Sequence, residues 1–114
     1  MTTTIYHNPR CSKSRQTLQL LKDRGIEPRV IEYLTPPPGK KELNNILTML
    51  GMEPRALMRR KETAYKEARL DNEALSRDEL ISEMIEQPIL IERPIVVSNG
   101  KAAIGRPPEN VLDI

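Results

Sequence analysis

A chain of 114 residues with 38% hydrophobic and 30% charged residues is long enough for one globular domain with a single hydrophobic core. The 18 basic and 16 acidic residues are mixed along the chain and give a net charge of +2, which argues against a clustered nucleic-acid-binding surface. No apolar stretch approaches the roughly 20 residues that span a bilayer, and the N-terminus has no export signal, so we expect a cytoplasmic protein that binds neither membrane nor nucleic acid.

Cysteine and histidine each occur once in the chain. One thiol cannot form an internal disulfide, and these two residues offer too few ligands for a zinc or copper site. We therefore expect no bound metal and no resident cofactor. If the chain carries out redox chemistry, the second thiol has to come from another molecule.

The first part of the chain predicts a strand, a helix and a second strand. Residues 3–6 are rich in strand formers and run into an Asn-Pro loop that ends at Cys11. From Ser12 onward apolar residues recur at helical spacing until Gly25, and residues 29–33 have a strand pattern. This order predicts two parallel strands joined by a right-handed crossover.

The middle of the chain predicts a helical block, at about residues 39–87. After a Pro-rich stretch, apolar residues at positions 43, 46, 47 and 50 have the spacing of an amphipathic helix. Pro54 suits the first turn of a short helix, which we expect to carry Arg59. Residues 62–73 are polar and weakly patterned, and a capping-box sequence at residues 76–79 predicts a last helix that ends before Pro88.

The last third of the chain predicts a β-hairpin. Residues 95–97 and 101–104 are strand-like, and the Asn99-Gly100 pair between them is the strongest short-range hairpin signal. The whole order predicts an α/β, thioredoxin-like (glutaredoxin-like) fold, in which a mixed sheet carries an inserted helical block. We expect residues 1–114 to form this single domain.

Cys11 is the candidate nucleophile. It lies at the predicted strand-to-helix junction, where backbone N–H groups and the positive end of a helix favour the thiolate. Arg10, Lys13, Arg15 and His7 lie within four residues of it. The alternative is a buried cysteine used as a small apolar side chain, and it is disfavoured because the residues that flank Cys11 do not look like core residues: Asn8, Pro9, Arg10, Ser12 and Lys13.

Ser14 and His7 are candidate supporting residues. A hydroxyl in the first turn of the helix could cap the helix or donate a hydrogen bond to the sulfur. The segment from Cys11 to Ser14 has the spacing of a redox dithiol with serine in the resolving position, so for Ser14 we favour the hydrogen bond to the sulfur. For His7, two roles stay open: support of the ionised sulfur or its loop, and simple packing with the ring satisfied by backbone groups.

Several separate motifs, in the right order, resemble the glutaredoxin-coupled arsenate reductase (ArsC) family over nearly the whole chain, in particular its subgroup with an Arg-Cys-Ser-Lys-Ser loop. The matching segments are residues 7–9 with Cys11 and residues 14–15, residues 55–57 with Arg59, residues 88–91 with residues 93–97, and residues 106–107 with residues 111–113. One departure is Ser12, because well-studied members of the family have glycine after the cysteine.

The resemblance implies an oxidoreductase of arsenic detoxification that reduces arsenate, or a similar oxyanion, to arsenite. It implies a covalent thioarsenate on Cys11, an anion-binding triad of Arg59, Arg93 and Arg106, and a cis peptide bond before the proline that follows Arg93. Glutathione would be the co-substrate and glutaredoxin the partner, and the single cysteine agrees with this because glutathione supplies the missing thiol. Composition alone does not choose these three arginines from the others, although guanidinium groups suit a tetrahedral oxyanion.

Two alternatives stay open. A monothiol glutaredoxin-like exchanger acting on glutathione mixed disulfides is compatible with Cys11 and Ser14. A non-enzymatic RNA polymerase-binding adaptor of the same fold is disfavoured because the redox-switched adaptors have a second cysteine where this chain has Ser14. A low-molecular-weight phosphatase is excluded because its loop needs an arginine six residues after the cysteine, where this chain has Thr17.

Overall fold

The computed structural model describes residues 2–114, which fold into two compact units. The first unit combines the N-terminal part of the chain up to Pro36 with Arg93–Ile114, and the second is Pro37–Glu92. Within residues 2–114, no helix is both long and apolar enough to cross a membrane. The prediction of a single domain over residues 1–114 stays a prediction.

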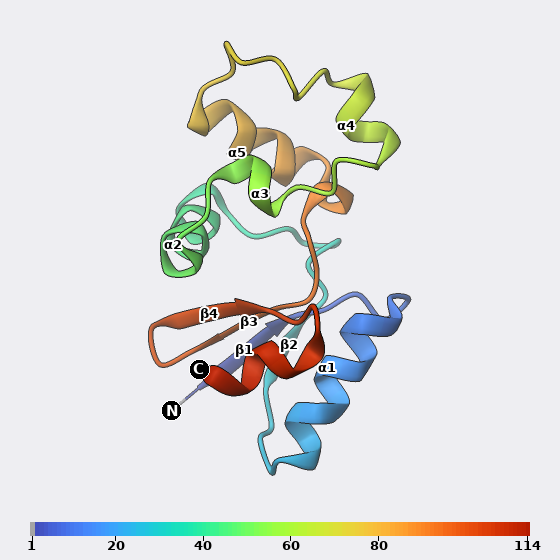
Figure 1. Cartoon of the computed structure of the whole chain (residues 1–114), viewed down its shortest axis with the longest axis vertical. Coiled ribbons are helices and arrows are strands. Elements are labelled where there is room, and N and C mark those ends of the chain that lie inside the picture. Colours follow the sequence, from blue (N-terminus) through green and yellow to red (C-terminus); the bar gives the residue numbers. More distant parts are fainter. Residues whose placement is uncertain (1) are drawn as a thin grey trace. The chain divides into compact units, whose positions relative to one another are not determined.

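The first unit contains a mixed sheet with the strand order β2-β1-β3-β4 (Figure 1). Its strands are β1 (Thr3–Tyr6), β2 (Arg29–Ile31), β3 (Ile95–Ser98) and β4 (Lys101–Ile104). β1 pairs in parallel with β2 and antiparallel with β3, and β3 pairs antiparallel with β4, as the thioredoxin-like prediction requires. β2 is shorter than predicted because the chain turns at Glu32, whose carbonyl accepts from the N–H of Thr35 at 3.1 Å.

The hairpin between β3 and β4 turns at Asn99 and Gly100, as predicted. Both residues have positive φ angles, 57° and 73°. A two-residue turn with two left-handed residues matches the twist of the flanking strands, and asparagine and glycine are the residues that tolerate it. The hairpin places Arg93, before β3, and Arg106, after β4, at the same end of the sheet, because Ile95 pairs with Ile104.

Two helical segments pack together in the first unit: α1 (Ser12–Asp23) and the C-terminal 3₁₀ helix η2 (Pro108–Asp113) (Figure 1). Their hydrophobic cluster with the sheet contains Ile5, Leu21, Val96 and Val111. η2 lies in a segment for which the sequence analysis predicts no element. Its position follows from Val111, which is buried in this cluster although the segment has little local helical signal.

The second unit is helical, as predicted. It contains α2 (Lys40–Leu50), α3 (Pro54–Leu57), α4 (Thr63–Glu67), α5 (Arg77–Glu86) and the 3₁₀ helix η1 (Pro88–Leu90), with α5 in contact with α2, α3 and η1. The capping box of α5 is present, because Ser76 Oγ accepts from the N–H of Glu79 and the Glu79 carboxylate accepts from the N–H of Ser76. α4 lies in the stretch that is polar and weakly patterned in the sequence, and Tyr65 is buried there.

The segment after α3 corrects one prediction. We expected Arg59 to lie in the short helix, but α3 ends at Leu57 and Met58 forms a bridge with Ile91. The N–H of Arg59 donates to Leu90 O at 2.7 Å, and the N–H of Glu92 donates to Leu57 O at 2.8 Å. These long-range hydrogen bonds replace the ones that a longer helix would make, so tertiary pairing overrides the local helical tendency.

Candidate active site

Cys11 lies where the sequence predicts it, at the N-cap of α1. Its backbone is extended (φ −94°, ψ 124°), and its N–H donates to Asn8 O at 3.0 Å. The first turn of α1 contains no acidic residue, and the cysteine is partly exposed. The thiol is therefore reachable and lies at the positive end of a helix, where negative charge is stabilised.

The surroundings of Cys11 favour its ionised form. Burial raises the pKa of the Cys11 thiol, but hydrogen bonds from the N–H of Ser14, from the Arg93 guanidinium and from the N–H of Lys13, together with the positive charge of Arg93, outweigh it. The pKa of Cys11 is therefore below its ordinary value. Because the thiolate is the nucleophilic form of cysteine, this site is suited to attack on an electrophile.

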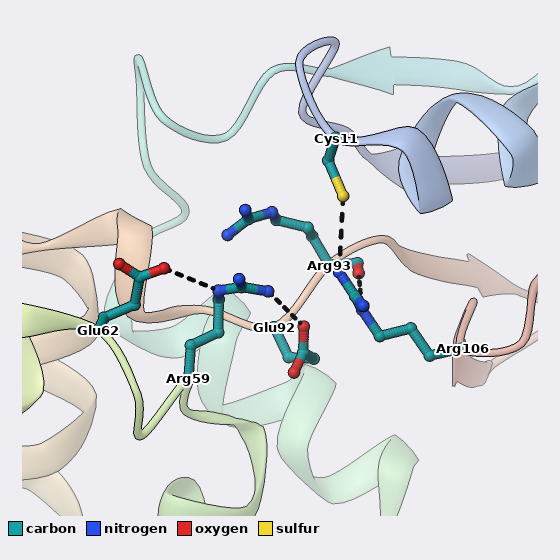
Figure 2. A network of polar contacts seen from close by, with 6 residues as sticks. All are labelled: Cys11, Arg59, Glu62, Glu92, Arg93 and Arg106. Carbon is teal, nitrogen blue, oxygen red and sulfur yellow. Dashed lines mark hydrogen bonds and ion pairs between the residues drawn. The ribbon is translucent and has the colours of Figure 1, made fainter.

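Arg93 and Arg106 meet at the sulfur of Cys11. Figure 2 shows Arg106 reaching the sulfur: its Nη2 donates to Cys11 Sγ at 3.5 Å, and its Nε donates to the carbonyl oxygen of Arg93 at 2.8 Å. Two guanidinium nitrogens of Arg93, Nε and Nη1, are buried. The β3–β4 hairpin thus places two permanently charged groups beside one thiolate, an arrangement that also suits an oxyanion bound at the sulfur.

Gly105 controls how closely the end of β4 approaches α1. Its N–H donates to Pro94 O at 2.9 Å, and the Arg93–Pro94 peptide bond is cis, as the resemblance implies. A Cβ atom built on Gly105 would collide with Thr17 Oγ1 and lie 2.8 Å from Pro94 Cγ. Only glycine fits this contact without movement, and the next residue is Arg106. Thr17 is therefore a supporting residue that the sequence alone did not reveal.

Ser14 and His7 organise the loop that carries Cys11. Both are buried, His7 Nδ1 lies 2.6 Å from Ser14 Oγ, and Ser14 Oγ accepts from the N–H of Asn8 at 3.0 Å. We predicted that the Ser14 hydroxyl donates to the sulfur. In the structure this hydroxyl instead bonds His7 and Asn8, because the side chain points into the unit, and it is the backbone N–H of Ser14 that contacts the sulfur.

The surroundings of His7 favour its neutral form. Burial lowers the pKa of His7, the carboxylate of Glu32 raises it, and the cations Arg15 and Lys22 lower it, so that it lies below the ordinary value. The lowered pKa favours the neutral ring over the positively charged one. Its structural role is to hold Ser14 and the loop in place.

Arg59 lies in the second unit, between two carboxylates. Its Nε donates to Glu62 Oε1 at 3.2 Å and its Nη1 to Glu92 Oε1 at 3.0 Å (Figure 2). Burial lowers the pKa of Arg59, but the two carboxylates raise it by more, so the pKa lies above its ordinary value and the guanidinium is a permanent cation. The predicted role of Arg59 as an anion ligand stays a prediction.

In the part of the chain that the structure describes, no cluster of three or more His, Cys, Asp or Glu side chains could hold a metal ion. What the site offers is one activated sulfur with neighbouring guanidinium groups. It is equipped for nucleophilic attack on an anionic electrophile.

Comparison with known proteins identifies relatives of this chain. Residues 6–114 match the ArsC family. The chain is 58% identical over 111 residues to a protein of Escherichia coli (strain K12) named "Uncharacterized protein YfgD", with 96% of this chain and 93% of that protein covered. It is 52% identical over 108 residues to a protein of Neisseria meningitidis serogroup A (strain Z2491) named "Arsenate reductase", with 94% and 92% covered.

A solved structure agrees with both sequence matches. The structure described as "Arsenate reductase from Vibrio cholerae" superposes with a TM-score of 0.97 at 56% sequence identity, and the match covers 100% of this chain and 98% of that one. The family match, the sequence identities and the superposition agree, and the chain belongs to the ArsC family.

Proposed function

We propose that this protein reduces arsenate to arsenite, with glutathione as co-substrate and glutaredoxin as partner, through a thioarsenate on Cys11. The observation that carries the proposal is the Cys11 thiol, whose pKa is lowered and whose sulfur accepts hydrogen bonds from Arg93 and Arg106. The arsenate reductase names of the Neisseria and Vibrio relatives support the choice of anion.

The first step is an attack of the Cys11 thiolate on arsenic. A sulfur–arsenic bond forms, and one arsenate oxygen leaves as water after taking up protons. Arg93 and Arg106 stabilise the negative charge on the remaining oxygens, because each guanidinium offers parallel N–H donors with the spacing of an oxyanion edge. We assign Arg59 to the same anion as a third cation.

Glutathione supplies the second thiol. Its sulfur displaces a second arsenate oxygen as water, so that arsenic carries both Cys11 and glutathione. A glutaredoxin thiolate then attacks the glutathione sulfur, and the arsenic–sulfur bond breaks with its electron pair left on arsenic. Arsenic(V) becomes arsenic(III), and the two thiols become a mixed disulfide.

Hydrolysis completes the cycle. Water replaces Cys11 on arsenic(III), which releases arsenite and restores the thiol. This cycle therefore needs only one cysteine in the chain, and the sequence contains one cysteine. We place the enzyme in the cytoplasm, because the reaction consumes reduced thiols and that compartment keeps thiols reduced.

The test is arsenite production with purified protein, glutathione, glutaredoxin and arsenate. Wild type is expected to turn over, and Cys11→Ser to lose all turnover, because a hydroxyl is not ionised near neutral pH. Reduction of hydroxyethyl disulfide by glutathione, measured beside it, separates a general thiol exchanger from an arsenate reductase. Activity in the disulfide assay alone, or full arsenate activity in Cys11→Ser, contradicts the proposal.

A further inference from the structure

A cavity of about 310 Å³ lies beside the Cys11 loop and is not part of the Cys11, Arg93 and Arg106 site. Residues 7–10 line one side, and Glu32, Leu34 and Thr35 line the other. All of these residues belong to the first unit. The volume is at the lower end of the range for small-molecule pockets, about 300–1,000 Å³.

The lining of this cavity carries both signs of charge. Arg10 and Glu32 are both exposed, and neither forms an ion pair within residues 2–114. Asn8 is 5% exposed, and its Oδ1 accepts from the N–H of Arg10 at 3.0 Å, which leaves the side-chain NH₂ group as the donor that it offers to a ligand. A cationic residue, an anionic residue and an amide residue therefore line one small space.

We infer that this cavity binds the γ-glutamyl end of glutathione, with the α-carboxylate at Arg10 and Asn8 and the α-ammonium at Glu32. This inference rests on the proposed function, in which glutathione is the co-substrate. The γ-glutamyl end has an ammonium group and a carboxylate group attached to one carbon atom, so it matches a cavity lined by one anionic and one cationic residue. The glycyl end carries a carboxylate only and would leave Glu32 without a counter-charge.

The position of the cavity suits delivery of the glutathione thiol. Arg10 is followed directly by Cys11, about 3.8 Å away between Cα atoms, and the N–H of Cys11 donates to Asn8 O at 3.0 Å. In glutathione the head group and the thiol are separated by about two residue lengths, roughly 7 Å. The inference therefore places the head group on the same loop as Cys11, with the glutathione thiol directed toward arsenic on Cys11. Its binding makes no covalent bond and orients the attack described above.

Two kinds of variant test the inference. Arg10→Ala and Glu32→Gln each remove one charge from the cavity, and Arg24→Ala and Glu27→Gln are matched controls at exposed positions outside it. Binding of S-methylglutathione, which cannot react, is measured by NMR titration of the full chain. The cavity variants are expected to raise its dissociation constant about fivefold or more, and the controls less than about twofold.

Kinetics provide a second measurement. In arsenate reduction the cavity variants are expected to raise the KM for glutathione, with the KM for arsenate and the pH dependence of Cys11 alkylation unchanged. Cysteinylglycine lacks the γ-glutamyl head group, so wild type should prefer glutathione over it, and Glu32→Gln should weaken that preference. Unchanged S-methylglutathione binding in both cavity variants would overturn the inference.

The outcomes separate this inference from the proposed function. Arsenate reduction with an unaltered KM for glutathione in both cavity variants means that the function holds and the cavity assignment is wrong. Binding of S-methylglutathione that depends on Arg10 and Glu32, in a protein without arsenate reductase activity, means that the cavity assignment holds and the reaction is a different one.

Discussion

Arg106 and Arg59 show two ways to hold a guanidinium group. In the first unit, Arg106 is oriented at Nε by the carbonyl oxygen of Arg93 and points Nη2 at the Cys11 sulfur. In the second unit, Arg59 is oriented by the carboxylates of Glu62 and Glu92. A carbonyl carries no net charge, so it orients the guanidinium group without offsetting its positive charge. A carboxylate orients the group and also offsets part of that charge. We therefore expect Arg106 to act on an anion more strongly than Arg59.

The largest effects on activity are expected from substitution of the two arginines beside the Cys11 sulfur. Arg106→Ala and Arg93→Ala should each lower kcat/KM for arsenate by about 10²–10³, the usual cost of removing a preorganised donor from a developing negative charge. Arg77→Ala is the matched control, because Arg77 is an exposed arginine of the second unit that pairs with Glu53. A loss in the control as large as in the two variants would contradict the prediction.

Arg93→Ala also has a predicted effect on the thiol itself. The guanidinium lowers the pKa of Cys11, so its removal should raise that pKa and reduce the thiolate fraction at a given pH. The rate of iodoacetamide alkylation, followed from pH 5 to pH 10, should therefore have its midpoint at higher pH than in wild type. A midpoint that does not move would contradict this role of Arg93 and leave Arg106 and the backbone N–H groups of Ser14 and Lys13 as the groups that stabilise the thiolate.

A smaller effect is expected at Arg59. Arg59→Ala should lower kcat/KM by about tenfold, because part of its charge is already balanced by carboxylates. Glu62→Gln removes one of these and should lower the KM for arsenate about twofold, since more of the positive charge then acts on the anion. Steady-state kinetics on the two variants check both directions. An unchanged kcat/KM in Arg59→Ala would remove this residue from the anion site.

A small effect on activity, with a clear effect on stability, is expected at Gly105. Gly105→Ala forces the new methyl group against Thr17 and Pro94 and should cost about 1–3 kcal/mol of unfolding free energy in urea. Any activity loss should be a few-fold, through displacement of the next residue, Arg106. The double variant with Thr17→Ala should recover part of both losses. Gly39→Ala is the control, because nothing lies within 4 Å of its added methyl group.

Local sequence patterns were sufficient to predict most elements of the fold. The helix after Cys11, the amphipathic helix before Gly51, the capping box at Ser76 and the Asn99-Gly100 hairpin all agree with the structure, because each depends on neighbours within about seven residues. η2 and the end of α3 did not follow from local signals, because Val111 and Arg59 are placed by contacts to distant segments.

For the candidate site, the sequence by itself determined the chemistry: one thiol at a helix start, a basic loop around it, and arginines that the family resemblance singled out. Only the tertiary structure decided which groups meet the sulfur. It assigned the Ser14 hydroxyl to His7 and the Ser14 N–H to Cys11, and it brought Arg106 to the thiolate. The reason is that a helix start is encoded over a few residues, whereas the hairpin that carries Arg93 and Arg106 reaches Cys11 only through sheet pairing across more than 80 residues of chain.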